Sequence, residues 1–308
     1  MRAAFSAALV EAATKDERVV LLTGDHGYAL FDEFRKRCPG QYINAGIAEQ
    51  NMVGVAAGLA KAGFRPIVYG LSAFVPVRVV EQIKIDVCYE KLPVIFTGDG
   101  AGLVYSTLGT SHQSFEDIAC LRSVPYIDIM SPCDAHELTA CMSIALTLQS
   151  PVYMRMGKAD LGAVHAKAPS LTRGELACVH RGQSRVHFIA TGSMVKTACE
   201  LGAEVDVSVW SAPWIKPLDA GQLGALAASS SAFVTLEEHS AAGGLGAAVL
   251  EAISETNPVP VLRIGVGERF SETCGSHAHA MREHGLDIAS IRSRVAPFVD
   301  KWPAFGAC

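Results

Sequence analysis

Short apolar runs and longer helical patterns alternate along the whole chain, and this alternation limits the folds that it can adopt. Runs that are almost continuously apolar are typical of strands buried on both faces of a parallel sheet. In the first half these runs are residues 19–22, 64–69, 93–97, 126–130 and 152–156, with helical stretches at 76–89 and 114–122 between them. Strands that alternate with helices form βαβ units, so the sequence predicts an α/β fold with a mainly parallel sheet flanked by helices.

A second α/β series follows a loosened stretch of small, polar and proline residues. Its predicted strands are residues 185–191, 205–210, 233–237 and 259–264. A chain of 308 residues is also too long for one ordinary core. We therefore expect two domains, each with a mainly parallel sheet flanked by helices: residues 1–163, a linker at 164–175, and residues 176–308.

Composition excludes several classes of function. A net charge of -5 gives no basic footprint for nucleic acid. No apolar run has the length of a membrane span, and the N-terminal residues resemble a helix rather than a signal peptide. Nine cysteines without a CxxC pair favour reduced thiols over a disulfide framework. The expected protein is cytoplasmic, with no nucleic-acid or membrane partner.

Residues 43–52, with the sequence INAGIAEQNM, are typical of a short strand, a tight turn and the start of a helix. The first turn of this helix carries one carboxylate, Glu49, and the helix continues through Lys61 with many glycines and alanines. Small side chains allow a neighbour to approach closely. A carboxyl held in such a packed interface can keep its proton and donate a hydrogen bond to a ligand nitrogen. The alternative is a carboxylate that only complements the helix dipole.

This segment resembles the glutamate motif of the thiamine-diphosphate enzymes, specifically the pyrimidine-binding domain of transketolase and of deoxyxylulose-phosphate synthase. The resemblance covers nearly the whole chain, since residues 214–219 and 235–239 resemble the transketolase C-terminal domain. It implies thiamine diphosphate as cofactor, with Glu49 as the catalytic residue that hydrogen-bonds the pyrimidine ring. It also implies that Phe74 packs on that ring. Outside the motif, Phe74 is equally explained as a core side chain.

The resemblance further implies substrate contacts. His112, within GTSHQ, matches a histidine that contacts substrate oxygens and assists proton transfer; a structural histidine is the alternative. Arg2 and Lys158 fall where the family places phosphate-binding arginines, although all such cations, Arg155 included, are also typical of solvated surface. Asp25 and His26 are further substrate-binding candidates, in a segment that lacks the family's phosphate-binding serine.

The metal and diphosphate motif of these enzymes is incomplete. It begins with Gly-Asp-Gly, as at residues 98–100, and closes with asparagines roughly 25 to 30 residues later, whose oxygens suit Mg²⁺. No asparagine lies at that distance. We therefore expect no metal site in this chain. Mg²⁺ ligands and the diphosphate site are expected on a partner subunit, with homodimers of this chain in a heterotetramer.

The leading hypothesis is one subunit of a split transketolase, a thiamine-diphosphate-dependent transferase active only with its partner. It would move a two-carbon ketol unit from a ketose-type donor to an aldehyde. Leu108 stands where transketolase has an aspartate that reads a donor hydroxyl, so specialised sugar-like substrates are expected. Alternatives are the β subunit of a 2-oxo acid dehydrogenase E1 component, deoxyxylulose-phosphate synthesis, or a non-catalytic scaffold subunit.

Overall fold

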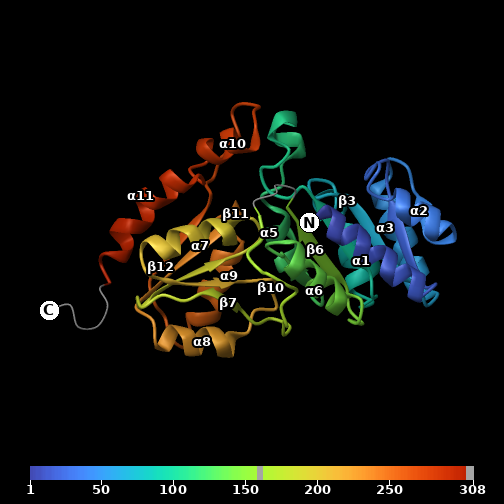
Figure 1. The fold of residues 1–308 in the computed structure, drawn as a ribbon. Helices are drawn as coiled ribbons and strands as arrows, with labels where there is room; N and C mark the ends of the chain where they lie inside the picture. The colour runs from blue at the N-terminus through green and yellow to red at the C-terminus, as the bar shows by residue number, and fades with distance from the viewer. Residues whose placement is uncertain (158–161, 303–308) are drawn as a thin grey trace.

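The computed structural model describes residues 1–157 and 162–302, which form two sheets with helices on both faces (Figure 1). The first sheet has seven strands in the order β10-β5-β6-β4-β3-β1-β2. Their bounds are β1 Val19–Thr23, β2 Tyr42–Asn44, β3 Arg65–Leu71, β4 Ile95–Asp99, β5 Asp128–Met130, β6 Val152–Met156 and β10 Trp214–Lys216. All neighbouring strands are parallel except β10, which is antiparallel to β5. The predicted mainly parallel sheet is confirmed.

Helices cover both faces of this sheet because its strands carry buried apolar side chains on both sides. One face packs against α1 (Arg2–Lys15), α2 (Asp32–Arg37) and α6 (Ala135–Ala145). The other packs against α3 (Glu49–Lys61), α5 (Asp117–Arg122) and the irregular helical segment described next. A short 3-10 turn, η1 (Pro39–Gln41), leads into β2.

The helix predicted at residues 76–89 is irregular. It consists of a 3-10 turn η2 (Val77–Val79), one α-helical turn α4 (Val80–Gln82) and a π-helical segment η3 (Ile83–Cys88). The segment is rich in β-branched residues, which have a slightly lower helix propensity than unbranched ones. The predicted helix at 114–122 is likewise shorter and begins at Asp117.

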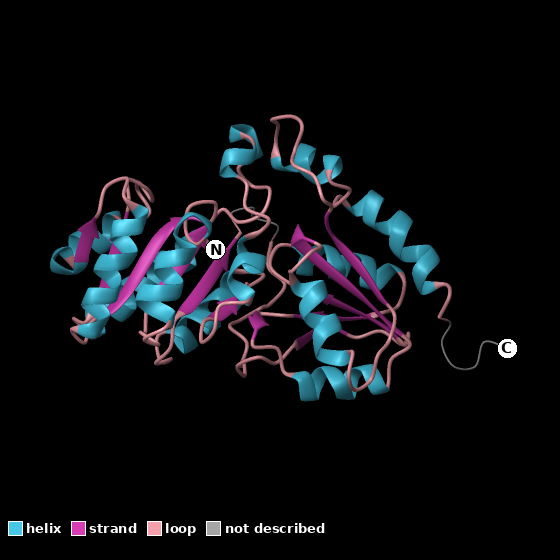
Figure 2. Cartoon of the chain, turned by 180° about the vertical axis from the view of Figure 1, so that it is seen from behind, coloured by secondary structure: helices cyan, strands magenta, loops and turns pink. Residues whose placement is uncertain are grey.

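The second sheet has five strands in the order β12-β11-β8-β9-β7, parallel except for β7 against β9 (Figure 2). The strands are β7 Ala177–His180, β8 Val186–Ala190, β9 Ser208–Ser211, β11 Ala232–Ser240 and β12 Val261–Val266. One face packs against α7 (Met194–Glu204), α10 (His277–Glu283) and α11 (Ile288–Val299), the other against α8 (Ala220–Ala228) and α9 (Leu245–Ile253). The predicted second α/β unit is therefore present.

The two halves share a core. One apolar cluster runs from Phe96 of the first sheet to Phe233 of the second. Strand β10, which the sequence did not predict, extends from the second half and completes the edge of the first sheet. Three residues are too few for a clear alternation pattern, which is why β10 gave no signal. The boundary at 164–175 remains our proposal for how the chain divides.

Arg155 is buried at the junction of the halves and is not the surface cation that the sequence suggested. Its side chain is 4% exposed, and its Nε lies 2.8 Å from a carboxylate oxygen of fully buried Asp117. The guanidinium also donates to the carbonyl oxygen of Glu238, 2.9 Å away in β11. A buried charge needs a paired and hydrogen-bonded environment, and this one has both.

His239 lies in the same buried network and is neutral. Its Nδ1 donates to the carbonyl of Ser240 at 2.8 Å, and its Nε2 accepts from the backbone N–H of Ala119 at 3.3 Å. Burial lowers the pKa of His239 to about 4, against the opposing effect of the nearby Asp117 carboxylate. A proton on Nε2 would face the N–H donor of Ala119, and this repulsion also favours a lowered pKa for His239.

We expect the His239→Gln variant to lose less stability on acidification than the parent protein. Between pH 6.5 and 4 the unfolded chain protonates this histidine and the native state does not. The free energy of unfolding therefore falls as pH falls, by about 1.4 kcal/mol per pH unit at most. Urea unfolding at pH 7 and pH 5 should show the parent losing about 2 kcal/mol more than the variant. Equal losses would contradict the assignment, and His279→Gln, at a side chain 44% exposed, is the matched control.

None of the helices within the described residues is long and apolar enough to cross a membrane. The eight cysteines of the described ranges are all free thiols. The expectation of reduced cysteines is confirmed for those eight.

Candidate active site

A tight turn between β2 and α3 fixes where Glu49 lies. Gly46 has a φ of +70°, which favours glycine, and its N–H donates to Asn44 Oδ1 at 2.9 Å. The loop that follows β1 passes close by: a Cβ on Gly24 would come within 2.9 Å of the Gly46 carbonyl oxygen. The two glycines thus bring His26 and Glu49 to the same edge of the sheet. This is the edge at the carboxyl ends of the strands, where sites on parallel sheets form.

Glu49 is the first residue of α3 and is 5% exposed, as the sequence predicted for a carboxylate in a packed position. Its Oε1 accepts a hydrogen bond from Arg78 Nη1 at 3.1 Å. His26 Nε2 lies 3.9 Å from the same oxygen and has no hydrogen-bond partner among the described residues, although it is buried. A buried nitrogen of this kind is left for a ligand or a water molecule.

Phe74 is the centre of the cluster. Its ring centroid lies 5.9 Å from that of His26 and 5.4 Å from that of His112, the latter in an edge-to-face arrangement. The Arg78 guanidinium carbon lies over the same ring, 4.0 Å from its centroid. The structure therefore brings together four of the residues singled out from the sequence: Glu49, Phe74, His26 and His112.

His112 lies on a loop that the second half of the chain supports. The loop contains the 3-10 turns η4 (Ser106–Leu108) and η5 (Thr110–His112), which lie beside the segment leading into α10 (Figure 1). The N–H of Gly275 donates to the carbonyl of Ser106 at 3.2 Å. Ser111 Oγ lies 3.0 Å from His112 Nδ1, which leaves Nε2 of the ring free of this contact.

The remaining predicted residues pair elsewhere, are exposed or lie outside the described ranges. Arg2, at the start of α1, is 3.3 Å from a carboxylate oxygen of Asp99, so an anion within the chain already pairs with it. Asp25 is exposed in the loop after β1. Lys158 lies outside the described residues. The sequence-based grouping of these three with the substrate stays a prediction.

Arg78 is the site residue that sequence reasoning missed. It follows Phe74 by four residues, one helical turn, and this spacing of an arginine after an aromatic residue was the available signal. The irregular helical geometry of residues 77–88 turns Arg78 back over the Phe74 ring and toward Glu49.

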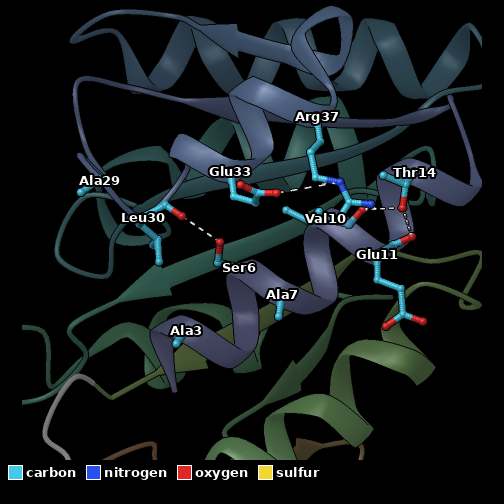
Figure 3. A pocket seen from close by; sticks show the side chains of 10 residues that line it. All are labelled: Ala3, Ser6, Ala7, Val10, Glu11, Thr14, Ala29, Leu30, Glu33 and Arg37. Carbon is cyan, nitrogen blue, oxygen red and sulfur yellow. Dashed lines mark hydrogen bonds and ion pairs between the residues drawn. The ribbon is translucent and has the colours of Figure 1, made fainter.

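The chain also has an open hollow of about 570 Å³ between α1 and α2, and this hollow is not a candidate active site (Figure 3). Its polar side chains bond to one another or to the backbone. Ser6 Oγ donates to the carbonyl of Leu30 at 2.7 Å, and Arg37 pairs with Glu33 at 4.0 Å. Polar groups engaged in this way give a ligand little to bind.

Comparison with known proteins agrees with this geometry. The family model described as transketolase, pyrimidine binding domain, matches residues 1–163, and the model described as transketolase, C-terminal domain, matches residues 175–291. A subunit of the apulose-4-phosphate transketolase of Phocaeicola vulgatus is 35% identical over 311 residues, with 97% of each chain covered.

Two further comparisons bear on the chain's extent. A 1-deoxy-D-xylulose-5-phosphate synthase of Oleidesulfovibrio alaskensis is 38% identical over 303 residues, and the match covers 94% of this chain but only 46% of that protein. A solved structure described as a split gene transketolase, inactive beta4 tetramer, superposes with a TM-score of 0.89 at 33% identity. That superposition covers 98% of this chain and 99% of the other.

Proposed function

Because the chain belongs to the transketolase family, we propose that it is the pyrimidine-binding subunit of a split transketolase that uses thiamine diphosphate. In this proposal the chain is a cytoplasmic transferase subunit, inactive until a diphosphate-binding subunit joins it. The observation that carries the proposal is the cluster of Glu49, Phe74, His26 and His112 at one sheet edge.

The cluster suits the aminopyrimidine ring of the cofactor. Arg78 already places a flat hydrogen-bond donor on the Phe74 ring and against the Glu49 carboxyl. An aminopyrimidine is also flat, stacks on aromatic rings and has nitrogens that a carboxyl can reach. The unpartnered Nε2 of His26 offers a further contact. When bound, the cofactor supplies the carbanion chemistry for cleaving and forming carbon–carbon bonds.

Two side chains of this subunit have proposed catalytic roles. Glu49 would hold the pyrimidine ring through a hydrogen bond to a ring nitrogen, the contact through which the subunit would tune the cofactor's proton chemistry. His112, whose ring lies edge-to-face against Phe74 with the centroids 5.4 Å apart, would hydrogen-bond to and exchange a proton with a substrate oxygen. Phe74 would orient the pyrimidine ring of the cofactor between Glu49 and His112.

The diphosphate and Mg²⁺ are assigned to the partner subunit. Asp99, the only acidic residue of the Gly-Asp-Gly sequence, accepts a hydrogen bond from Tyr69 Oη at 2.9 Å and pairs with Arg2. These two contacts give it a structural role at the end of β4. The apulose-4-phosphate transketolase relative, itself named as one subunit, and the split-gene structure both support a family plan in which a separate chain completes the site.

Calorimetry with thiamine diphosphate and Mg²⁺ tests the proposal, first on this chain alone and then with the diphosphate-binding subunit added. We expect heat of binding only when both subunits are present. Tight, metal-dependent binding by this chain alone would overturn the assignment of the diphosphate site to a partner. No binding in either case would favour the scaffold alternative.

We further propose that two copies of this chain meet at the exposed face of α3. Gly54 and Gly58 leave open space on that face, and Val55 is 39% exposed beside them. Across the adjoining surface, Ile85 and Tyr89 are 52% and 79% exposed. Small residues beside exposed apolar ones suit close helix contact. A Val55→Arg variant should shift the chain toward monomers in light scattering, whereas unchanged mass would place the contact elsewhere.

The substrate is proposed to be a specialised sugar rather than an ordinary ketose phosphate. Leu108 is 54% exposed in the His112 loop and has no group that can hydrogen-bond to a substrate hydroxyl. A site without such a hydrogen-bonding group does not select for that hydroxyl. The relative that is named an apulose-4-phosphate transketolase is consistent with this direction. Turnover of ordinary ketose phosphates by the reconstituted pair at rates typical of transketolases would contradict it.

We expect the Arg78→Ala variant, in the reconstituted pair, to bind thiamine diphosphate more tightly than the parent. Arg78 covers the Phe74 face, so the cofactor must displace the ion pair of half-exposed Arg78 with buried Glu49 and a cation–π contact, worth about 0.5–2 kcal/mol together. Their removal corresponds to a decrease in Kd of between about twofold and about thirtyfold. Calorimetry gives the comparison, with Arg292→Ala, in an exposed ion pair with Glu204, as the control. Weaker binding would mean that Arg78 contacts the bound cofactor.

A further inference from the structure

Three side chains of different chemistry meet where α6 begins. Cys133 precedes the helix, Glu137 is in its first turn, and His165 follows the gap in the described residues. A sulfur, a carboxylate oxygen and a ring nitrogen from these residues all lie within 4.8 Å of one another. Cys133 is 8% exposed and Glu137 is fully buried, while the His165 side chain is 13% exposed. The group is separate from the Glu49 cluster.

Asp134 holds the histidine of this group in place. One of its carboxylate oxygens, Oδ2, accepts from the backbone N–H groups of Val164 and His165, at 2.8 and 2.7 Å. The same oxygen lies 3.1 Å from His165 Nδ1. In the tautomer that donates from Nδ1 to Asp134, Nε2 is free to coordinate and lies 3.9 Å from Glu137 Oε1, while Nδ1 lies 3.7 Å from Cys133 Sγ. A histidine fixed by a carboxylate in this way is the usual arrangement of metal-binding histidines.

The donor set favours a borderline transition metal over Mg²⁺. Thiolate, imidazole and carboxylate are the ligands of Zn²⁺, whereas Mg²⁺ takes oxygen ligands alone. Three protein ligands leave a fourth position for water. We propose that Cys133, Glu137 and His165 form a site for a Zn²⁺-type divalent cation, with Asp134 as the positioning residue behind His165.

Binding requires small, defined changes. Cys133 coordinates as the thiolate and its proton passes to solvent, while neutral His165 coordinates through Nε2. Glu137 keeps the hydrogen bond that its Oε2 accepts from the Cys133 N–H at 2.6 Å and gives Oε1 to the metal. Oε1 also accepts from Ser211 Oγ, 2.8 Å away in β9. The cation would therefore tie together α6, the segment between the two halves, and the second sheet.

This inference is independent of the proposed cofactor chemistry. The sequence predicted no metal site because the Mg²⁺ motif is incomplete and the cysteines form no CxxC pair. Cys133 and His165 are separated by 32 positions. Their approach depends on the fold.

Co²⁺ is the probe, because thiolate ligation gives a charge-transfer absorption that carboxylate or histidine ligation alone does not. The full chain is freed of metal by a chelator, dialysed and titrated with Co²⁺, and Zn²⁺ is then added in competition. We expect about one equivalent of Co²⁺, a thiolate charge-transfer band and its loss on Zn²⁺ addition. Saturating Zn²⁺ should also raise the Tm by about 5 °C.

The variants separate ligation from packing. Cys133→Ser and His165→Gln should both fold and both lose the band and the Zn²⁺-dependent shift in Tm. Cys141→Ala, which removes a buried thiol within α6 itself, should keep both. Absence of the band in the parent protein, or its survival in Cys133→Ser, would overturn the proposal. Neither outcome depends on cofactor binding or transferase activity, so it leaves the proposed function untouched.

Discussion

Replacing Glu49 with glutamine should reduce the activity of the reconstituted pair by about 10²–10³-fold, equivalent to about 3–4 kcal/mol in the activation barrier. Glutamine keeps the size of the side chain and can still pack at the start of α3. It cannot supply a carboxyl proton to a ring nitrogen, and it cannot form the ion pair with Arg78. Initial rates with saturating cofactor are the measurement, because they separate the catalytic effect from weaker binding.

Glu33→Gln is the matched control for this experiment. Glu33 is also a carboxylate in a first helical turn of the same half of the chain, but it lies in α2 with Arg37 as its partner. Its replacement should leave the rate unchanged. If Glu49→Gln keeps the parental rate as well, the carboxyl has no catalytic role, and the scaffold alternative becomes the better account of this subunit.

Much of the fold could be predicted from the sequence because parallel strands buried on both faces leave a strong signal. The run at residues 152–156 is a strand with the predicted bounds, and β1 extends the predicted run by one residue, to Thr23. The turn and helix start around Glu49 were predicted correctly as well. Gly46 adopts a positive φ and Asn44 accepts a hydrogen bond from its N–H, and both residue types are typical of tight turns.

What the sequence could not show depends on contacts between distant residues. The three-residue strand β10 is a strand only because β5 offers it an edge to pair with. The pairing of Arg155 with Asp117 brings a strand residue to a helix 38 positions earlier. An isolated arginine in a sequence is most often exposed, so solvated surface was one of the two interpretations left open for Arg155, and the fold contradicts it.

Some residues of the candidate site could also be predicted from the sequence, and others could not. Glu49, Phe74 and His112 were singled out by motif and do meet in space, whereas Arg78 was not, because its role needs the irregular turn of residues 77–88. Arg2 was assigned to phosphate from its position in the chain, but the structure pairs it with Asp99. Because a buried carboxylate already pairs with this cation, its attraction for an anionic ligand is weaker.

The second large effect concerns the junction of the two halves, where Arg155→Met should lower the free energy of unfolding by about 3–5 kcal/mol. Methionine is close in length and apolar, so packing is largely kept. Asp117 would stay fully buried without its cation, its Oδ2 still accepting from Tyr153 Oη at 2.6 Å. The backbone carbonyl of Glu238 would also lose its donor. Urea unfolding at pH 7 gives the comparison.

The double variant Arg155→Met with Asp117→Asn tests whether the lost stability comes from the buried Asp117 carboxylate that is left without a cation. Asparagine is neutral and keeps an oxygen that can accept from Tyr153, so the double variant should regain a large part of the loss. If it is no more stable than Arg155→Met, the loss comes from packing and from the unsatisfied Glu238 carbonyl instead. Arg292→Met, which breaks an exposed pair with Glu204, should cost far less stability than Arg155→Met. A loss at Arg155 no greater than at Arg292 would mean that the buried pair stabilises the protein no more than an exposed pair does.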